Sequence, residues 1–229
     1  MAQRNGNKLL KMVTELLDFQ KVEQSAQPVR LQDIELPMLL RLQIDKFALA
    51  AQEKHIQLSL ETCPQQQIHS DLKMMDLILE NLLSNAIKYT PQGGKVTLSA
   101  SVEGKMALIH VCDTGIGIPR AEVKSIFKSF FRASNAVDSQ EMGSGLGLML
   151  TQKLVEKLQG KLSFVSEEGK GTTFSVKLPL GNATAPTVRL VGEKQKVATE
   201  TPLAEDKHPE TSQTLSSALL HHAGVPKDT

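Results

Sequence analysis

The chain has 229 residues, 40% of them hydrophobic, which is enough for one ordinary domain with flanking segments but too few for two full domains. Its 26 basic and 25 acidic residues give a net charge of +1, so no overall field draws it to nucleic acid or to an anionic membrane. Aromatic residues make up only 3% and Trp is absent, which disfavours a base-stacking surface for single-stranded nucleic acid.

Residues 1–27 predict a helix followed by a linker. From Asn7 to Gln24 apolar residues recur with the 3-4-3 rhythm of a helical stripe, and Ser25–Pro28 ends this pattern. Two interpretations are open: the helix caps the core of its own domain, or it is one helix of a dimeric bundle. The linker favours the bundle, in which this helix would pair two copies of the chain.

Residues 28–180 predict one domain in which helices alternate with strands and hairpins. Asp33 and Asp71 are candidate N-caps for two helices. The predicted helices are 33–51, 71–88, a short one near 122–127 and one at about 145–158. The predicted strands are 56–62, 95–102, 105–112, 161–166 and 172–178. This order favours an α+β sandwich, with helices covering one face of a mixed, mostly antiparallel sheet.

Residues 181–229 lack any sustained periodicity. They are rich in Pro, Thr, Ala, Glu and Lys, a composition that predicts a mostly disordered tail. The tail is also too short for a further domain of about 100 residues.

The sequence also bears on the compartment. Cys63 and Cys112 form neither a metal-ligand spacing nor a disulfide framework, which predicts buried thiols in a reducing environment. No apolar run reaches the roughly 18 to 20 residues of a membrane span, and the first residues lack a signal-peptide core. We therefore expect this segment to be cytoplasmic, whether or not a parent protein is membrane-anchored.

A first group of polar residues lies on the helix predicted at 71–88. Asn81, Asn85 and Lys88 are separated by four and three residues, so they share one helical edge. An amide oxygen can ligate Mg²⁺, and a lysine can contact phosphates. The alternative is an ordinary solvated helix face.

A second group, Asp113-Thr-Gly-Ile-Gly-Ile-Pro119, follows a predicted strand. A carboxylate there can accept from an exocyclic amine, and the glycines let the backbone approach a flat ring. The alternative is a simple Asp-x-Gly turn.

A third group, Gly143-Ser-Gly-Leu-Gly-Leu148, opens a predicted helix, where backbone N–H groups suit a polyphosphate. It is neither a Walker loop, since no Gly-Lys-Ser/Thr follows, nor a Rossmann site, since no strand directly precedes it.

An aromatic segment, residues 126–132, precedes this third group. It predicts a lid hinged on Phe127, Phe130 and Phe131, with Arg132 able to reach a phosphate. The alternative is a short helix buried by its phenylalanines.

The order of these segments resembles a known family. NLLSNAIKYTP, DTGIGIP, FKSFFRAS and GSGLGL, in that sequence, are similar to the N, G1, F and G2 boxes of the histidine kinase ATP-binding domain. Gyrase and MutL share its Bergerat-type fold. The resemblance covers about residues 33–180, and the compact boxes also look like those of hybrid sensors from Bacteroidetes. It implies ATP and Mg²⁺ as cofactors of a two-component phosphorelay enzyme.

The resemblance also implies a role for each matching residue. Asn85 would hold Mg²⁺ with support from Asn81, Lys88 and Arg132 would contact phosphates, and Tyr89 would border the nucleotide. Asp113 would accept from the adenine amino group, beside Gly115, Gly117 and Ile118. Gly143, Gly145, Leu146 and Gly147 would form the phosphate-side loop. Asn81, Lys88 and Arg132 would be the catalytic set.

One part of the family pattern is missing. Such kinases phosphorylate a histidine that is usually followed by Glu or Asp, and none of the six histidines here has that context. The resemblance therefore places the acceptor helix upstream of Met1, and implies a response regulator receiver domain as the next partner.

Three functions follow from these patterns. The first is phosphoryl transfer from ATP to a histidine supplied by another segment. The second is ATP hydrolysis of the gyrase or MutL type, which is disfavoured because Asn81 stands where those enzymes need a Glu base. The third is a nucleotide-binding interaction module without kinase activity.

Overall fold

The computed structural model describes residues 28–138 and 144–181, so the predicted first helix, Gly143 and nearly all of the predicted tail lie outside the described residues. The strands are β1 Gln32–Glu35, β2 Gln57–Leu60, β3 Gln67–Ser70, β4 Lys95–Glu103, β5 Met106–Asp113, β6 Lys161–Glu167 and β7 Gly171–Pro179. The helices are α2 Leu36–Glu53, α3 Leu72–Tyr89, a 3₁₀ turn Val123–Ser125, α4 Ser134–Asp138 and α5 Gly147–Lys157.

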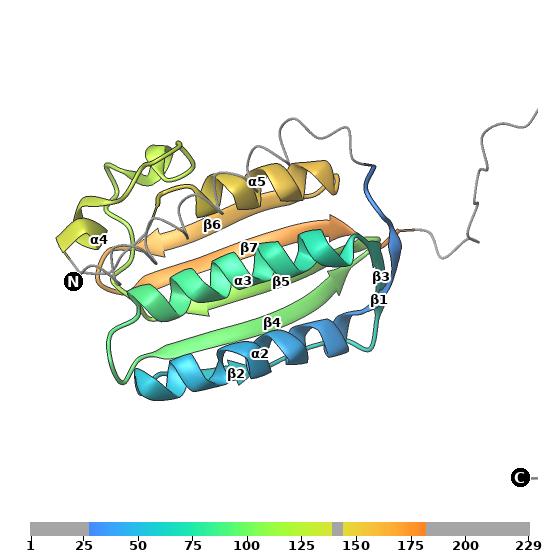
Figure 1. Cartoon of the computed structure of the whole chain (residues 1–229), viewed down its shortest axis with the longest axis horizontal. Coiled ribbons are helices and arrows are strands. Elements are labelled where there is room, and N and C mark those ends of the chain that lie inside the picture. The colour runs from blue at the N-terminus through green and yellow to red at the C-terminus, as the bar shows by residue number, and fades with distance from the viewer. Residues whose placement is uncertain (1–27, 139–143, 182–229) are drawn as a thin grey trace, which may run out of the picture. The chain divides into compact units, whose positions relative to one another are not determined.

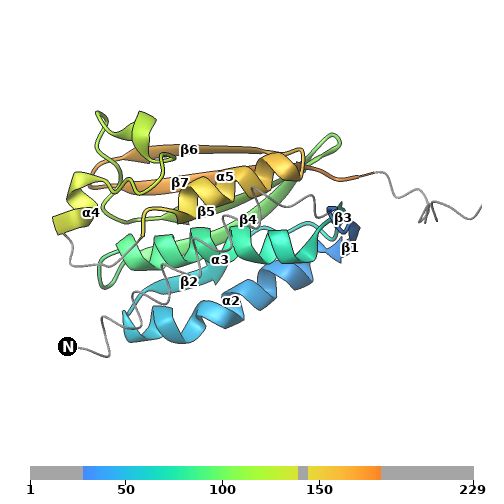
Figure 2. The same ribbon diagram turned by 45° about the horizontal axis from the view of Figure 1, so that its top comes forward.

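The main sheet has five strands in the order β2-β4-β5-β7-β6. The pair β2–β4 is parallel and the other three pairs are antiparallel, so the sheet is mixed but mostly antiparallel. Helices α2, α3 and α5 lie side by side over one face of this sheet (Figures 1 and 2). The predicted α+β sandwich is confirmed.

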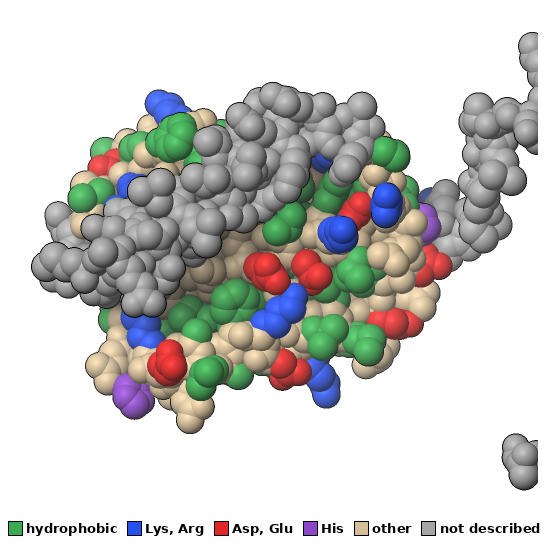
Figure 3. All heavy atoms as spheres, viewed as in Figure 1, with side chains coloured by type: hydrophobic (Ala, Val, Ile, Leu, Met, Phe, Trp, Pro, Cys, Tyr) green, Lys and Arg blue, Asp and Glu red, His purple; other side chains and the backbone are tan. Residues whose placement is uncertain are grey.

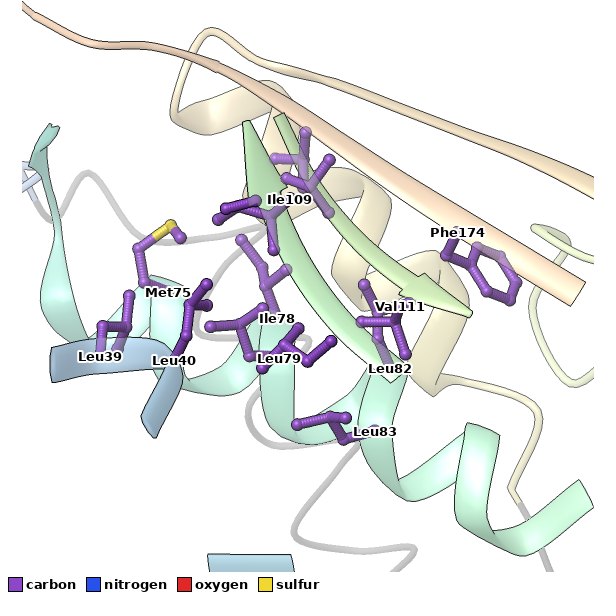
Figure 4. Close-up of a cluster of buried hydrophobic side chains, with 14 of the residues drawn as sticks. Leu39, Leu40, Met75, Ile78, Leu79, Leu82, Leu83, Ile109, Val111 and Phe174 are labelled. Atoms are coloured by element: carbon purple, nitrogen blue, oxygen red, sulfur yellow. The ribbon is translucent and has the colours of Figure 1, made fainter. Parts of the chain in front are cut away.

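Helix α3 lies between α2 and α5 and packs on the sheet at the centre of the core. Its apolar residues recur every three or four positions, so one stripe meets the sheet and α2. Figure 4 shows Leu79 and Leu82 of this helix among Ile109 and Val111 of β5, and all four are buried. Because the core fixes both the rotation and the height of α3, it also fixes the polar edge on the helix's other side.

The start of α2 differs from the prediction. Asp33 is not a helix cap: it lies in β1, which pairs antiparallel with β3 in a separate two-stranded sheet. The helix begins only at Leu36, and Glu35 makes no side-chain cap. The Nδ1 atom of His69 lies 2.7 Å from an Asp33 carboxylate oxygen, so Asp33 serves as a cross-strand partner.

The predicted cap of α3 is confirmed. The side chain of Asp71 accepts a hydrogen bond from the Met74 N–H at 3.2 Å, which satisfies one of the free donors in the first turn. The other carboxylate oxygen of Asp71 accepts from the Arg30 N–H at 2.8 Å. One buried carboxylate therefore joins the chain segment before β1 to the start of α3.

Helix α5 begins two residues later than predicted, at Gly147. Gly145 has a φ of +74°, a left-handed conformation that the α-helix cannot contain. None of the predicted helices covers Ser134–Asp138, where the structure has the short helix α4.

The structure also bears on the two cysteines and on the expectation that no segment spans a membrane. Cys63 and Cys112 are free thiols as expected, but both are half-buried rather than buried, and burial raises the pKa of Cys63. Among the described helices, none has the length and apolar character that crossing a bilayer requires. Figure 3 shows acidic and basic side chains interspersed over α2 and α3, in keeping with the balanced charge of the sequence.

Candidate functional site

An open cavity lies where α3 ends, beside the ends of β5 and β7 and the start of α5. The three polar segments and the aromatic segment all contribute to its wall, although they are far apart in the sequence. The residues of the predicted site that line it are Asn81, Asn85, Lys88, Tyr89, Asp113, Gly117, Ile118, Arg132, Gly145 and Gly147.

The other predicted site residues lie elsewhere. Gly115 is packed behind Asp113, where a Cβ atom would come within 2.6 Å of the Tyr89 carbonyl oxygen. Leu146 is buried, and its N–H is bonded to the Ser144 hydroxyl, so its side chain belongs to the core rather than to the cavity wall. Gly143 lies outside the described residues.

Asp113 is the carboxylate in the cavity wall and is 9% exposed. Its Oδ1 accepts from the N–H groups of Gly115 at 2.8 Å and Thr172 at 3.1 Å. Burial raises the pKa of Asp113 to about 6, and the two N–H donors oppose that rise by stabilising the charge. The two bonds hold the carboxyl group in one orientation at the cavity wall.

The loop after Asp113 is held by the β6–β7 hairpin. The Ile118 N–H donates to the Ser166 hydroxyl at 2.9 Å, and the Gly169 N–H donates to the Ile116 carbonyl at 2.8 Å. Gly117 has a φ of +64°, and a Cβ atom there would collide with the Glu167 carbonyl. The loop therefore needs a glycine at this position to lie so close to the hairpin.

The C-terminal end of α3 is also fully bonded. The Ala86 carbonyl accepts from the N–H and the hydroxyl of Thr90. The ammonium group of Lys54, which follows α2, donates to the next two carbonyls, those of Ile87 and Lys88. The Tyr89 carbonyl accepts from Ile116 N–H at 3.1 Å. The last carbonyls of this helix, which an isolated helix would leave unpaired, are thus all satisfied.

The two asparagines on the α3 edge have different surroundings. Among the described residues Asn85 makes no side-chain hydrogen bond, so its amide is available to a ligand. Asn81 is engaged, because its amide nitrogen donates to the Thr151 hydroxyl of α5 at 2.7 Å. The Asn85 amide is thus unrestrained by the protein, whereas the Asn81 amide is held through its nitrogen and its oxygen lies close to Gly147 of α5.

Two cationic side chains line the cavity. The Lys88 ammonium group donates to the Tyr89 hydroxyl at 2.7 Å and lies 4.4 Å from the centre of that ring. The Arg132 guanidinium donates to the Ala136 carbonyl of α4 at 2.8 Å. Both cations hold positions from which a phosphate could be reached after a change of rotamer.

The three phenylalanines of the predicted hinge lie in two different environments. Phe127 packs edge-on against Phe164 of β6, with ring centres 5.7 Å apart, and Phe131 lines the cavity. Phe130 is 67% exposed, has a φ of +61°, and donates its N–H to the Gly145 carbonyl. The alternative, burial by the phenylalanines, holds for Phe127 and Phe131 but not for Phe130, and a lid in this segment stays a prediction.

Sequence reasoning missed several residues of the wall. Thr172 and Phe174 come from β7, and Asn135 comes from α4, where its amide nitrogen donates to the Gly117 carbonyl at 3.1 Å. The run Gly-Lys-Gly-Thr-Thr-Phe174 is a signal that could have indicated the first two, since the register pairs Thr172 with Asp113. Asn135 has no comparable signal.

Comparisons with known proteins agree with this geometry. Residues 70–182 match the family described as histidine kinase-, DNA gyrase B-, and HSP90-like ATPase. The sensor histidine kinase WalK of Bacillus subtilis is 31% identical over 183 residues, which are 78% of this chain and 30% of WalK. The sensor protein EvgS of Escherichia coli is 32% identical over 237 aligned positions, which cover 100% of this chain and 20% of EvgS. The chain thus spans less than a third of either relative.

A solved structure extends the likeness to three dimensions. Full-length ShkA in complex with AMPPNP is 29% identical, with a TM-score of 0.67 over 77% of this chain and 36% of ShkA. The matched domain, the shared fold and the cavity that joins the motifs lead to one conclusion. Residues 70–182 are an ATPase domain of the histidine kinase, gyrase and HSP90 type, and the relatives that this chain matches over most of its length are sensor histidine kinases.

Proposed function

We propose that this chain binds Mg²⁺–ATP in the cavity and transfers the γ-phosphoryl group to a histidine of another protein segment. The imidazole nitrogen attacks the γ-phosphorus, a P–N bond forms, and the bond to the β,γ-bridging oxygen breaks as ADP leaves. The attacking nitrogen is the unprotonated one of the neutral ring, and the proton on the other ring nitrogen passes to solvent after the P–N bond has formed. The protein's part is to position the nucleotide and to neutralise its charge.

The observation that carries the proposal is the buried carboxylate of Asp113. Its Oδ1 is occupied by two backbone donors, so the other oxygen is left to accept from a ligand. The exocyclic amine of adenine is such a donor, whereas guanine presents a carbonyl oxygen at the equivalent position and would be repelled. The backbone on either side, at Gly117 and Thr172, completes a narrow wall for a flat ring.

The opposite part of the cavity suits phosphates and a metal ion. The described residues hold no group of three His, Cys, Asp or Glu side chains that could bind a metal without the nucleotide. The unbonded amide of Asn85 fits Mg²⁺, which takes one or two protein oxygens and completes its shell with phosphates and water. Bound there, Mg²⁺ would neutralise phosphate charge, and Lys88 and Arg132 would add two cations from the protein.

Hydrolysis as the main activity has little support from the geometry. Glu80, the carboxylate next to Asn81, accepts a hydrogen bond from Lys46 of α2 at 2.8 Å, on the surface between the two helices. It does not line the cavity, and no other glutamate does within the described residues. A water molecule beside the γ-phosphate would have no carboxylate base comparable to that of gyrase.

The remaining parts of the proposal concern segments around the domain. None of the described histidines lines the cavity, and His110 is bonded to Ser175 on the sheet. An acceptor histidine from another helix and a response regulator as the next phosphate carrier are therefore included in the proposal. So are the boundaries 1–27, 28–180 and 181–229, pairing of two chains through residues 7–24, and a cytoplasmic location, where ATP is available.

Calorimetry of Mg²⁺–ATP binding tests the site. We expect the full chain to bind ATP, Asp113→Ala to abolish binding and Asp113→Asn to weaken it, because the two backbone donors would hold the amide oxygen and the NH2 group would face the ring amine. Asp45→Ala, which removes an exposed carboxylate on α2, serves as the matched control and should leave binding intact. A folded wild-type chain that does not bind ATP would refute the assignment.

Transfer needs a second experiment, with a histidine-bearing dimerisation segment of a related kinase supplied in trans. Phosphohistidine that depends on ATP and on Asp113 would support a kinase. Binding of ATP without transfer to any segment tried would favour the alternative, a nucleotide-binding interaction module.

A further inference from the structure

We propose that Thr151 is a positioning residue that orients the Asn81 amide at the metal side of the cavity. This inference rests on the proposed function, because it concerns the same nucleotide site. It assigns a task to a residue that does not itself line the cavity.

The contact is specific, and its threonine end is buried. Thr151 is 1% exposed, lies on the face of α5 that packs against α3, and its hydroxyl oxygen is 2.7 Å from the Asn81 amide nitrogen. A buried hydroxyl that lost this partner would be left unsatisfied, so the pair has a strong preference to stay bonded.

A second residue of α5 confines the same amide. Gly147 is one helical turn before Thr151, so both lie on one face of α5. A Cβ atom on Gly147 would collide with Oδ1 of Asn81, which shows how closely the amide oxygen lies against the helix. One end of the amide is therefore bonded and the other is in contact with backbone, which leaves it a single orientation.

The orientation matters because of what lies one turn further along α3. Asn85 follows Asn81 by four residues on the same edge, and both side chains line the cavity. Without its bond to Thr151, the Asn81 amide could rotate toward Asn85. It would then compete with the unbonded Asn85 amide for the same ligand. By holding Asn81 against α5, Thr151 keeps the Asn85 amide available and keeps α3 in register with the Gly-rich loop.

The test measures binding of AMPPNP to the full chain by calorimetry, once with Mg²⁺ and once with EDTA. Wild-type protein should bind more tightly with Mg²⁺. Thr151→Val keeps the side-chain volume but removes the hydroxyl; it should leave the affinity in EDTA unchanged and reduce the Mg²⁺ enhancement by about three- to tenfold. Thr151→Ser, which restores the hydroxyl, should recover most of the enhancement.

Two controls separate positioning from stability. Thr97→Val makes the same change at a buried threonine of β4 outside the cavity, and should alter neither affinity. In a double-mutant cycle, adding Thr151→Val to Asn81→Ala should produce no further loss, because the partner is already gone. This cycle also tests the inference if Thr151→Val alone lowers the unfolding temperature.

Each other outcome counts against the inference. An equal loss in Mg²⁺ and in EDTA would show a purely structural role for Thr151, and an unchanged enhancement would show no role. Wild-type binding without any Mg²⁺ enhancement would leave no metal side for Thr151 to organise. A wild-type chain that binds no nucleotide in either buffer would instead overturn the proposed function, and the role of Thr151 with it.

Discussion

On the strand side of the cavity, formed by β5 and β7, the wall is bonded by backbone N–H donors, whereas on the lid side, residues 122–136, side chains take part in the bonds as well. Near β5 and β7, backbone N–H groups bond Asp113, Ile116 carbonyl and Tyr89 carbonyl. Near α4, the side chains of Glu122, Arg132 and Asn135 bond backbone groups of the lid and its neighbours.

This difference bears on how a ligand would be received. Backbone bonds within a sheet and its hairpin do not rearrange without breaking the fold, so the strand side is shaped before a nucleotide arrives. Arg132 and Asn135 each donate to a protein carbonyl, and a ligand oxygen can replace that carbonyl as the acceptor. We infer that recognition of the ring is built in, while contacts to the phosphate end form on binding.

The largest expected effect comes from a substitution on the strand side. Gly117→Ala should lower the free energy of unfolding by about 2 to 4 kcal/mol, because a positive φ and a collision with the Glu167 carbonyl are both imposed on the alanine. Gly104→Ala is the matched control, since Gly104 also has a positive φ, +58°, but no atom within 4 Å of the added Cβ. It should cost about 1 kcal/mol. If urea denaturation showed equal losses of unfolding free energy for Gly117→Ala and Gly104→Ala, the close approach of Gly117 to the Glu167 carbonyl would be contradicted.

The next effect concerns the end of α3. Lys54→Met should destabilise the fold by about 1 to 2 kcal/mol, because the carbonyls of Ile87 and Lys88 lose a charged donor. Lys46→Met removes an exposed lysine paired with Glu80 and should cost well under about 1 kcal/mol. Similar losses for the two variants in urea denaturation would show that Lys54 makes only a surface contact.

A pH titration sharpens the description of the strand side. The pKa of Asp113 is raised from 3.8 to about 6, so the protonated form predominates in the folded protein below pH 6. If the ionised carboxylate binds the ring amine, ATP affinity should fall about tenfold between pH 7 and pH 5. Asp113→Asn should show a flat profile over the same range, measured by calorimetry.

The raised pKa of Asp113 also makes stability depend on pH, in the opposite direction to the ATP affinity. A raised carboxyl pKa means that the folded state holds its proton more tightly than the unfolded chain. The resulting stabilisation is fully present below about pH 4 and is lost as the pH rises through about 6. Relative to Asp113→Asn, wild-type protein should therefore lose stability across that window.

The smallest expected effect is on the lid side. Asn135→Ala should change the free energy of unfolding by less than about 1 kcal/mol, because it removes side-chain bonds to a loop and no core packing. It should increase the dissociation rate of bound nucleotide by about two- to fivefold, measured in stopped flow, since α4 is no longer tied to Gly117. A stability loss larger than that of Lys54→Met would remove the contrast between the two sides.

The sequence predicts the parts of the fold that depend on local patterns. Helix α3 has an Asp cap and a regular apolar stripe, so its existence, start and polar edge follow from the sequence alone. Strand β1 does not follow, because its four residues form a strand only through pairing with β3, more than thirty positions later. Asp33 is an acceptable helix cap in isolation, and the pairing overrides that preference.

The candidate site likewise has residues that the sequence predicts and residues that it does not. The motif residues could be placed at one cavity because a strand end, a helix edge and a glycine-rich helix start each have a recognisable chemistry. Thr172 reaches the site through the register between β5 and β7, and Thr151 through the packing of α5 on α3. Both depend on tertiary contacts, which no spacing in the sequence encodes.

The two ends of the described part of the chain lie at one corner of the fold. Arg30 is bonded to Asp71 there, and the Leu180 carbonyl accepts from the His69 N–H. In Figures 1 and 2 this corner, marked by β1 and β3, is at the far end of the sheet from α4 and the lid. Both points at which further segments are attached to this unit therefore lie at the end of the sheet away from α4.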